Sequence, residues 1–137
     1  MKAKPPRLTL ASSVNAWPDT KPLVLTDLFS LAENPERLAW QPFCPGVEIY
    51  RLYERTESGS EAALLKYAPG ASVPVHRHGG YEHILVLSGS QSDHRGTYAA
   101  GSLVVNAPET SHAVTSENGC IVLIVWEKPV VLKEENC

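Results

Sequence analysis

Two histidines and a glutamate at even spacing are the residues of this sequence best suited to chemistry. His76 and His78 stand two positions apart, and Glu82 follows four positions later, after Gly79-Gly80. Side chains two positions apart on a β-strand point to the same face. The glycine pair permits a turn or bulge that brings Glu82 back towards the two imidazoles. Since imidazoles and carboxylates bind divalent transition metals, the stretch predicts one wall of a metal site.

His112 is the predicted fourth ligand. It follows about one β-hairpin later, where an antiparallel neighbour could present it from a facing wall. Three imidazoles and one carboxylate suit one divalent transition metal per chain, with zinc or iron expected first and manganese or nickel as alternatives. One or two positions would stay open for water or substrate, which is typical of catalytic and sensing sites. Histidines on strands are also common as surface or core residues, so a metal-free reading stays open.

Short strands must position these residues. After Trp40, β-type runs follow one another, and Gly, Pro, Asn and Ser separate them, without a helix-length period. The expected strands are 47–53, 62–67, 72–77, 82–87, 90–93, 97–99, 102–105, 112–116, 121–127 and 130–133. This pattern indicates an all-β sandwich or barrel. Before it, residues 21–29 predict a short strand ending in a turn, and 34–37 predict a brief helical turn.

The chain of 137 residues is long enough for one domain. We expect an N-terminal arm over 1–22 and a single domain over 23–137. The net charge of −3 argues against a nucleic-acid or anionic-membrane partner, and no apolar run approaches the length of a membrane span. The start also lacks a signal-peptide core, so a cytoplasmic location is expected. Three cysteines without a CxxC pair predict no disulfide framework.

Other candidate residues are expected to have ordinary roles. His83 has the opposite parity to Glu82 and should face away from the metal, packed at an interface. His94 should be solvated in a turn. The tyrosines at 67, 81 and 98 could line the pocket or lie in the core. Glu57 and Glu61 should belong to a solvated loop, and a catalytic cysteine is disfavoured because no histidine lies near one in sequence.

A dimer is also expected. Alternate residues of 82–88 are largely apolar on both faces, and 121–126 is apolar throughout. A strand of this kind is covered on both sides. Because a chain of this length has little material for two layers of cover, the pattern predicts a homodimer interface.

The spacing resembles the first motif of the cupin superfamily. Gly70, five residues, His76, one residue, His78, three residues, Glu82, six residues and Gly89 complete that motif. In the second motif Gly101 stands eleven before His112, but Ala107 occupies the usual proline position, Glu109 replaces the usual glycine and Ser116 the usual asparagine. Residues from Trp40 to about Val131 are similar to ChrR-type cupins, in PFCPGVEIYRLY, ALLKYAPGASVPVHRHGGYEHILVLSGSQSD, YAAGSLVVNAPETSH and ENGCIVLIVWEKPV.

The resemblance implies a cupin fold (double-stranded β-helix, a small jelly-roll-like barrel), a zinc- or iron-type site at His76, His78, Glu82 and His112, and frequent dimers. It does not imply sigma-factor binding, which belongs to a separate helical zinc domain with an HxxxCxxC motif that this sequence lacks.

Three functional hypotheses follow. The first is a small metalloenzyme acting on an oxygenated organic compound, because ChrR-type cupins resemble diketone-cleaving and hydroxyacetophenone-cleaving dioxygenases. The second is a non-catalytic zinc-binding sensor of the ChrR type with a small-molecule ligand. The third is a metal-free isomerase, which would need a histidine base opposite a tyrosine acid. The catalytic residues and the substrate are left open.

Overall fold

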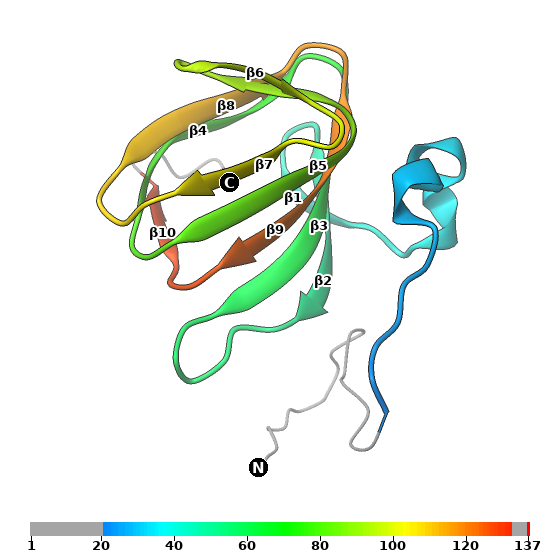
Figure 1. Cartoon of the computed structure of the whole chain (residues 1–137), viewed down its shortest axis with the longest axis horizontal. Helices are drawn as coiled ribbons and strands as arrows, with labels where there is room; N and C mark the ends of the chain where they lie inside the picture. Colours follow the sequence, from blue (N-terminus) through cyan, green and yellow to red (C-terminus); the bar gives the residue numbers. More distant parts are fainter. Residues whose placement is uncertain (1–20, 133–136) are drawn as a thin grey trace.

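A curled antiparallel sheet makes up most of the protein (Figure 1). The computed structural model describes residues 21–132 and residue 137. Within them the strands are β1 (Gln41–Cys44), β2 (Val47–Tyr53), β3 (Glu61–Tyr67), β4 (Ala71–His78), β5 (Glu82–Asp93), β6 (Gly96–Ala99), β7 (Leu103–Asn106), β8 (Ser111–Ser116), β9 (Cys120–Trp126) and β10 (Val130–Leu132). The strand order is β1-β2-β3-β9-β5-β8-β4-β10, while β6 and β7 pair with β5. The all-β prediction is confirmed.

The strand order decides which residues can meet. The strand β8 lies between β4 and β5, so elements far apart in sequence become neighbours. In the β4–β8 ladder His76 lies directly opposite His112. Residue Glu82 lies at the start of β5, opposite Trp126 of β9 and Asn106 of β7.

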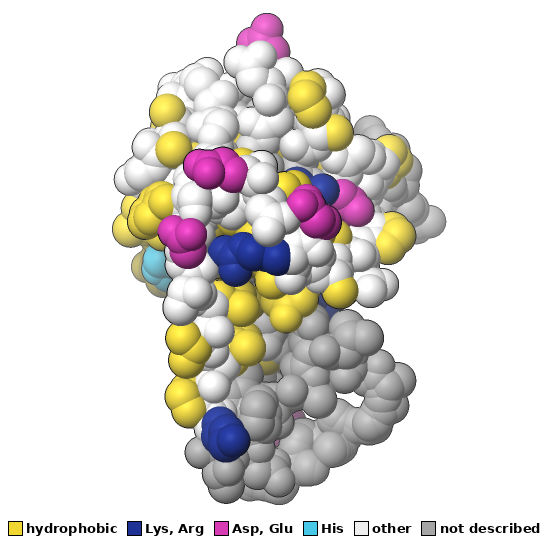
Figure 2. All heavy atoms as spheres, turned by 90° about the vertical axis from the view of Figure 1, so that its right-hand side faces the viewer, with side chains coloured by type: hydrophobic (Ala, Val, Ile, Leu, Met, Phe, Trp, Pro, Cys, Tyr) yellow, Lys and Arg dark blue, Asp and Glu magenta, His cyan; other side chains and the backbone are white. Residues whose placement is uncertain are grey.

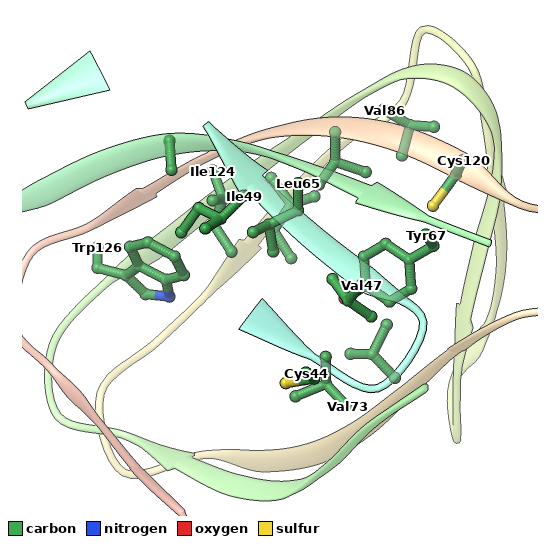
Figure 3. Close-up of a cluster of buried hydrophobic side chains, with 14 residues drawn as sticks. Cys44, Val47, Ile49, Leu65, Tyr67, Val73, Val86, Cys120, Ile124 and Trp126 are labelled. Carbon is green, nitrogen blue, oxygen red and sulfur yellow. The ribbon is translucent and has the colours of Figure 1, made fainter. Parts of the chain in front are cut away.

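The main core fills the concave side of the curled sheet (Figure 3). Small and branched side chains from β2, β3, β5 and β9 meet those of β4 and β8 across this interior. Trp126 lies at one end of the labelled cluster, and Tyr67 and Cys120 lie at the other. This apolar packing supports the strands that carry the histidines.

A second core covers part of the convex side. Leu31 of the 3-10 helix η1 (Leu28–Glu33) is fully buried against Leu64, Leu87 and Ile121. The second 3-10 helix, η2 (Pro35–Arg37), confirms the helical turn expected at 34–37. The strand expected over 21–29 is wrong: residues 22–27 are irregular and 28–33 are helical, because leucines here pack onto the sheet without a strand partner.

The remaining strand predictions agree closely with the structure. Two expected strands, 82–87 and 90–93, are one continuous strand, β5, in which Gly89 has φ 73°. One strand, β1, was not predicted, because it overlaps the Pro/Gly-rich stretch PFCPG, which is typical of a turn. The expected arm over 1–22 lies mostly outside the described residues, and the division into arm and domain stays a prediction.

Two residue predictions are wrong. Cys44 and Cys137 form a disulfide across 93 positions, whereas Cys120 is free and buried. An odd cysteine count therefore did not exclude a pair. Glu61 is not solvated: it is buried in β3 and forms ion pairs with Arg51 and Arg55.

The outer surface carries charges of both signs. On the side that bears η1 and η2, acidic and basic side chains are interspersed with apolar ones (Figure 2). Among the described residues no helix is long and apolar enough to span a membrane. The cytoplasmic location stays a prediction, and the disulfide weighs against it, since such bonds persist mainly in oxidising compartments.

Candidate metal centre

The structure brings the four predicted ligands together. His76, His78, Glu82 and His112 are all buried, and one ligand atom from each lies within 4.8 Å of the others. The three imidazole rings are packed edge to face, with centroids 4.7 to 5.1 Å apart. As predicted, the even spacing puts His76 and His78 on the same face of β4, and the bend at Gly79-Gly80 brings Glu82 close to them. His112 comes from the strand next to β4, not from a facing wall.

Hydrogen bonds fix the tautomers of His76 and His112. The Nδ1 of His76 lies 2.9 Å from the carbonyl oxygen of Pro74, which can only accept. The Nδ1 of His112 lies 2.9 Å from the carboxylate oxygen Oδ2 of Asp93. Both Nδ1 atoms must therefore donate, which leaves a lone pair on each Nε2.

His78 reaches the same state through a threonine. Its Nδ1 lies 3.0 Å from Oγ1 of Thr110, whose hydroxyl donates to the carbonyl of Ala107 at 2.6 Å. Because that hydroxyl proton is already used, the threonine oxygen accepts from Nδ1–H of His78. The Nε2 of His78 thus also carries a lone pair.

Two of these three lone pairs are buried without a hydrogen-bond partner. Among the described residues the buried nitrogen atoms His78 Nε2 and His112 Nε2 are unsatisfied. Oε1 of Glu82 lies 3.0 Å from the first and 3.7 Å from the second. Acceptors facing each other at this distance repel unless a cation lies between them. Two ligands of one metal ion, at about 2.1 Å and a right angle, lie about 3 Å apart. The four residues therefore fit a divalent metal.

Glu82 is oriented from two neighbouring strands. Asn106 donates from Nδ2 to Oε1 at 3.0 Å, and Trp126 donates from Nε1 to Oε2 at 2.9 Å. Both donors are buried. Hydrogen bonds to the charged form stabilise the carboxylate inside the fold.

The electrostatics of the site favour a cation. Burial would raise the pKa of Glu82, but His112 and His78, when a proton on Nε2 makes them donors to it, outweigh burial and hold that pKa well below its usual range. Burial lowers the pKa of His76, which favours the neutral imidazole, the form that binds a metal. Burial also acts to lower the pKa of His112, but Glu82 and Asp93 outweigh it, so this pKa is raised. A proton and a metal therefore compete for the same nitrogen.

A small apolar cavity adjoins the cluster. Its volume is about 40 Å³, room for little more than a small molecular group, and His76, Glu82 and His112 form its polar wall. The other lining residues are mainly apolar: Phe43, Leu65, Val73, Ile84, Val114, Ile124, Trp126, Val130 and Leu132, with Tyr67, Gln91 and Cys137. Such a cavity excludes water from a group that enters it and offers polar groups on one side.

Most other candidates take the places expected of them, but the expectation that Tyr81 lines the pocket or lies in the core is wrong, because its side chain is 49% exposed. His83 is exposed and faces away from the cluster, and His94 is exposed in the β5–β6 turn. Tyr67 lines the cavity, whereas Tyr81 is exposed. Tyr98 donates from its hydroxyl to Asp93. The supporting residues Asp93, Asn106, Thr110 and Trp126 were missed, since no spacing signal joins them to the histidines.

The comparison with protein families decides the assignment. The model of the ChrR cupin-like domain matches residues 30–130. The chain belongs to the ChrR cupin-like family. This confirms the resemblance and the cupin fold that the sequence predicts.

Two relatives place this ChrR-like cupin among known proteins. The anti-sigma-E factor ChrR of Cereibacter sphaeroides is 36% identical over 99 residues, which is 69% of this chain and 45% of that protein. This chain therefore spans less than half the length of that curated relative. The solved complex of Rhodobacter sphaeroides SigE with the anti-sigma factor ChrR matches with a TM-score of 0.62 and 25% identity, over 79% of this chain and 70% of that chain.

Cupins of other kinds share the fold. An acetylacetone dioxygenase from Acinetobacter johnsonii matches with a TM-score of 0.68 and 16% identity, over 93% of this chain and 87% of that one. An RmlC-like cupin from Ralstonia eutropha JMP134 matches with a TM-score of 0.64 and 22% identity, over 76% and 73%. At these identities the matches show the fold alone.

One departure from the cupin motif has a visible consequence in this ChrR-like cupin. Glu109, which replaces the usual glycine, has φ 71° in the turn before His112. Its backbone N–H donates to the carbonyl oxygen of His78 at 2.9 Å. The turn keeps the left-handed conformation that glycine adopts freely and glutamate does not.

Proposed function

We propose that this chain is a metal-binding cupin in which His76, His78, Glu82 and His112 hold one divalent transition metal, zinc or iron first. The observation that carries the proposal is the pair of buried, unsatisfied atoms His78 Nε2 and His112 Nε2, fixed as lone-pair donors beside the Glu82 carboxylate. A metal ion bound there would act as a Lewis acid, or, if iron, would activate dioxygen.

The cavity beside the site supports a small organic molecule as substrate. Its walls are mainly apolar, and its polar wall is formed by His76, Glu82 and His112. We therefore propose a small oxygenated compound, such as a ketone or diketone, whose oxygen points to the site and of which one small apolar group enters the cavity and packs on the apolar side chains. The protein orients this molecule and excludes water. The proposed activity is that of a dioxygenase-like oxidoreductase.

Oxygen uptake tests this activity. The metal-free protein is loaded with iron(II) without air, and oxygen consumption is measured with a panel of diketones and aromatic ketones. We expect consumption with at least one compound and none for His76→Ala treated in the same way. If the iron-loaded wild type consumed no oxygen with any compound of the panel, the catalytic proposal would be contradicted.

A second candidate is a zinc-binding sensor without turnover. The observation that favours it is the 36% identity to an anti-sigma factor. A sensor should bind zinc and a small ligand, and the bound ligand should change the thermal unfolding of the zinc-loaded protein while no product forms. A metal-free isomerase is disfavoured, because burial strongly raises the pKa of Tyr67, the tyrosine that lines the cavity, and so weakens it as an acid.

We also propose a homodimer. On the convex side of the sheet His83 of β5 lies between Val105 of β7 and Val125 of β9, and Leu103 is adjacent. Leu103 is 62% exposed and Val105 48%. The leucine-rich N-terminal segment covers the neighbouring part of this face, but His83, Leu103 and Val105 are left exposed beside the half-buried Val125, so a second copy packed here would bury them.

A further inference from the structure

Arg95, in the turn between β5 and β6, contacts the supports of two of the four proposed ligands. Its Nη2 lies 2.9 Å from Oδ2 of Asp93, the residue that accepts from His112. The same Nη2 lies 2.6 Å from Oδ1 of Asn106, the residue that donates to Glu82. We infer that Arg95 is a positioning residue that holds Glu82 and His112 in their metal-binding orientation. This inference rests on the proposed metal site.

The contact with Asn106 determines which way its side-chain amide faces. An amide has one accepting oxygen and one donating nitrogen, and a rotation of 180° exchanges them. Arg95 can only donate, so it requires Oδ1 on its own side. The Nδ2 group must then face Oε1 of Glu82 and donate to it. Without the arginine, a rotated amide would direct its oxygen at the carboxylate and repel it.

The contact with Asp93 is made to both carboxylate oxygens. The backbone N–H of Arg95 donates to Oδ1 at 2.8 Å, and the guanidinium donates to Oδ2. The Asp93 side chain is only 3% exposed, so its negative charge needs partners inside the fold. Holding both oxygens fixes the one that accepts from Nδ1 of His112, and with it the plane of that imidazole.

These hydrogen bonds form one circuit, which only the proposed metal ion would close. It runs from Glu82 through Asn106, Arg95 and Asp93 to His112, whose Nε2 lies 3.7 Å from the starting carboxylate. An ordinary surface ion pair contributes little to stability, because both partners are solvated. Arg95 differs in that its acceptors are buried while the arginine itself is 45% exposed. A change at the surface can therefore reach two ligands at once.

Metal affinity tests the inference. The affinity for zinc is measured by competition with a chromophoric chelator for the wild type and for Arg95→Gln. Since supports of metal ligands contribute about 10- to 100-fold in affinity, we expect a loss in that range. Arg95→Lys, which keeps a donor for Asp93, should recover part of it. The matched control is Arg55→Gln, which removes an arginine of similar exposure, 48%, from a buried glutamate far from the site in sequence. It should bind zinc as the wild type does.

Two further readouts separate positioning from general damage. The visible spectrum of the cobalt(II) protein reports ligand geometry, and we expect Arg95→Gln to change it while circular dichroism of the metal-free protein stays the same. In an Asp93→Asn background, Arg95→Gln should cost less affinity than it does in the wild type, because the two act on one circuit.

The possible results are distinct. A wild type that binds no zinc would contradict the proposed function itself. Zinc binding by the wild type, with Arg95→Gln matching Arg55→Gln in affinity and matching the wild type in cobalt spectrum, would overturn the role of Arg95 alone. The role of Arg95 would also be overturned if Arg95→Gln cost as much zinc affinity in the Asp93→Asn background as it does in the wild type.

Discussion

Trp126 donates its indole N–H to the buried carboxylate of Glu82, with Nε1 2.9 Å from Oε2. The two residues are 44 positions apart and lie opposite each other in the β5–β9 ladder. The strand pairing thus places a donor beside a proposed metal ligand, and Asn106 satisfies the other oxygen. A tryptophan that resembles core packing in the sequence has a polar role at the site.

Trp126→Phe should lower metal affinity about tenfold, because it removes one of two neutral donors that orient Glu82. Trp40→Phe is the control: it removes an indole whose N–H donates to the carbonyl of Pro35, outside the site. Zinc competition measures both variants. Equal affinities for the two would show that the Trp126 bond does not orient a ligand.

The disulfide should stabilise the fold. Cys44 and Cys137 close a loop of 93 positions, and such cross-links contribute about 2–4 kcal/mol. Cys137→Ser and Cys44→Ser should each lower the free energy of unfolding by that amount in denaturant titrations, and a reductant should lower the wild type equally. Thiol titration of the denatured, unreduced protein should find one free thiol, that of Cys120. Three free thiols would contradict the bond.

The left-handed turn before His112 should tolerate glycine. Glu109→Gly relieves a φ of 71° and should raise the free energy of unfolding by about 0.5–1 kcal/mol. The variant also loses an exposed ion pair with Arg77, so Arg77→Gln serves as the control for that loss. A Glu109→Gly protein less stable than Arg77→Gln would mean that the glutamate is needed in this turn.

The convex face should mediate self-association. Val105→Lys places a charge in the patch formed by His83, Leu103, Val105 and Val125, and should shift the protein from dimer to monomer in light scattering after gel filtration. Val131→Lys is the control, since this valine has a similar exposure on β10, in the other part of the sheet. A monomeric wild type at micromolar concentration, or a dimeric Val105→Lys, would contradict the proposed interface.

The features that could be predicted from the sequence are those that depend only on the alternation of side chains along one strand. The alternation of a strand puts His76, His78 and Glu82 on one side, and His83 on the other, and the structure agrees. The supports of the site were not predictable in this way. Trp126 and Asp93 meet their partners across 44 and 19 positions, and only the strand order determines those contacts.

Errors of the sequence analysis also have a physical origin. Apolar residues in 21–29 are compatible with a strand, but a strand needs a pairing partner, and here the leucines pack on the sheet from irregular and 3-10 segments. The Cys44–Cys137 pair depends on bringing β1 and the last residue together, which no cysteine spacing reveals.

Metal content of the purified protein tests the central claim most directly. Elemental analysis of the wild type, after loading with zinc or iron(II) and removal of excess ion, should find close to one metal per chain. His112→Ala should lose most of it while its circular dichroism is unchanged. Wild type and His112→Ala both without metal, or both with one ion per chain, would contradict the assignment of His76, His78, Glu82 and His112 as a metal centre.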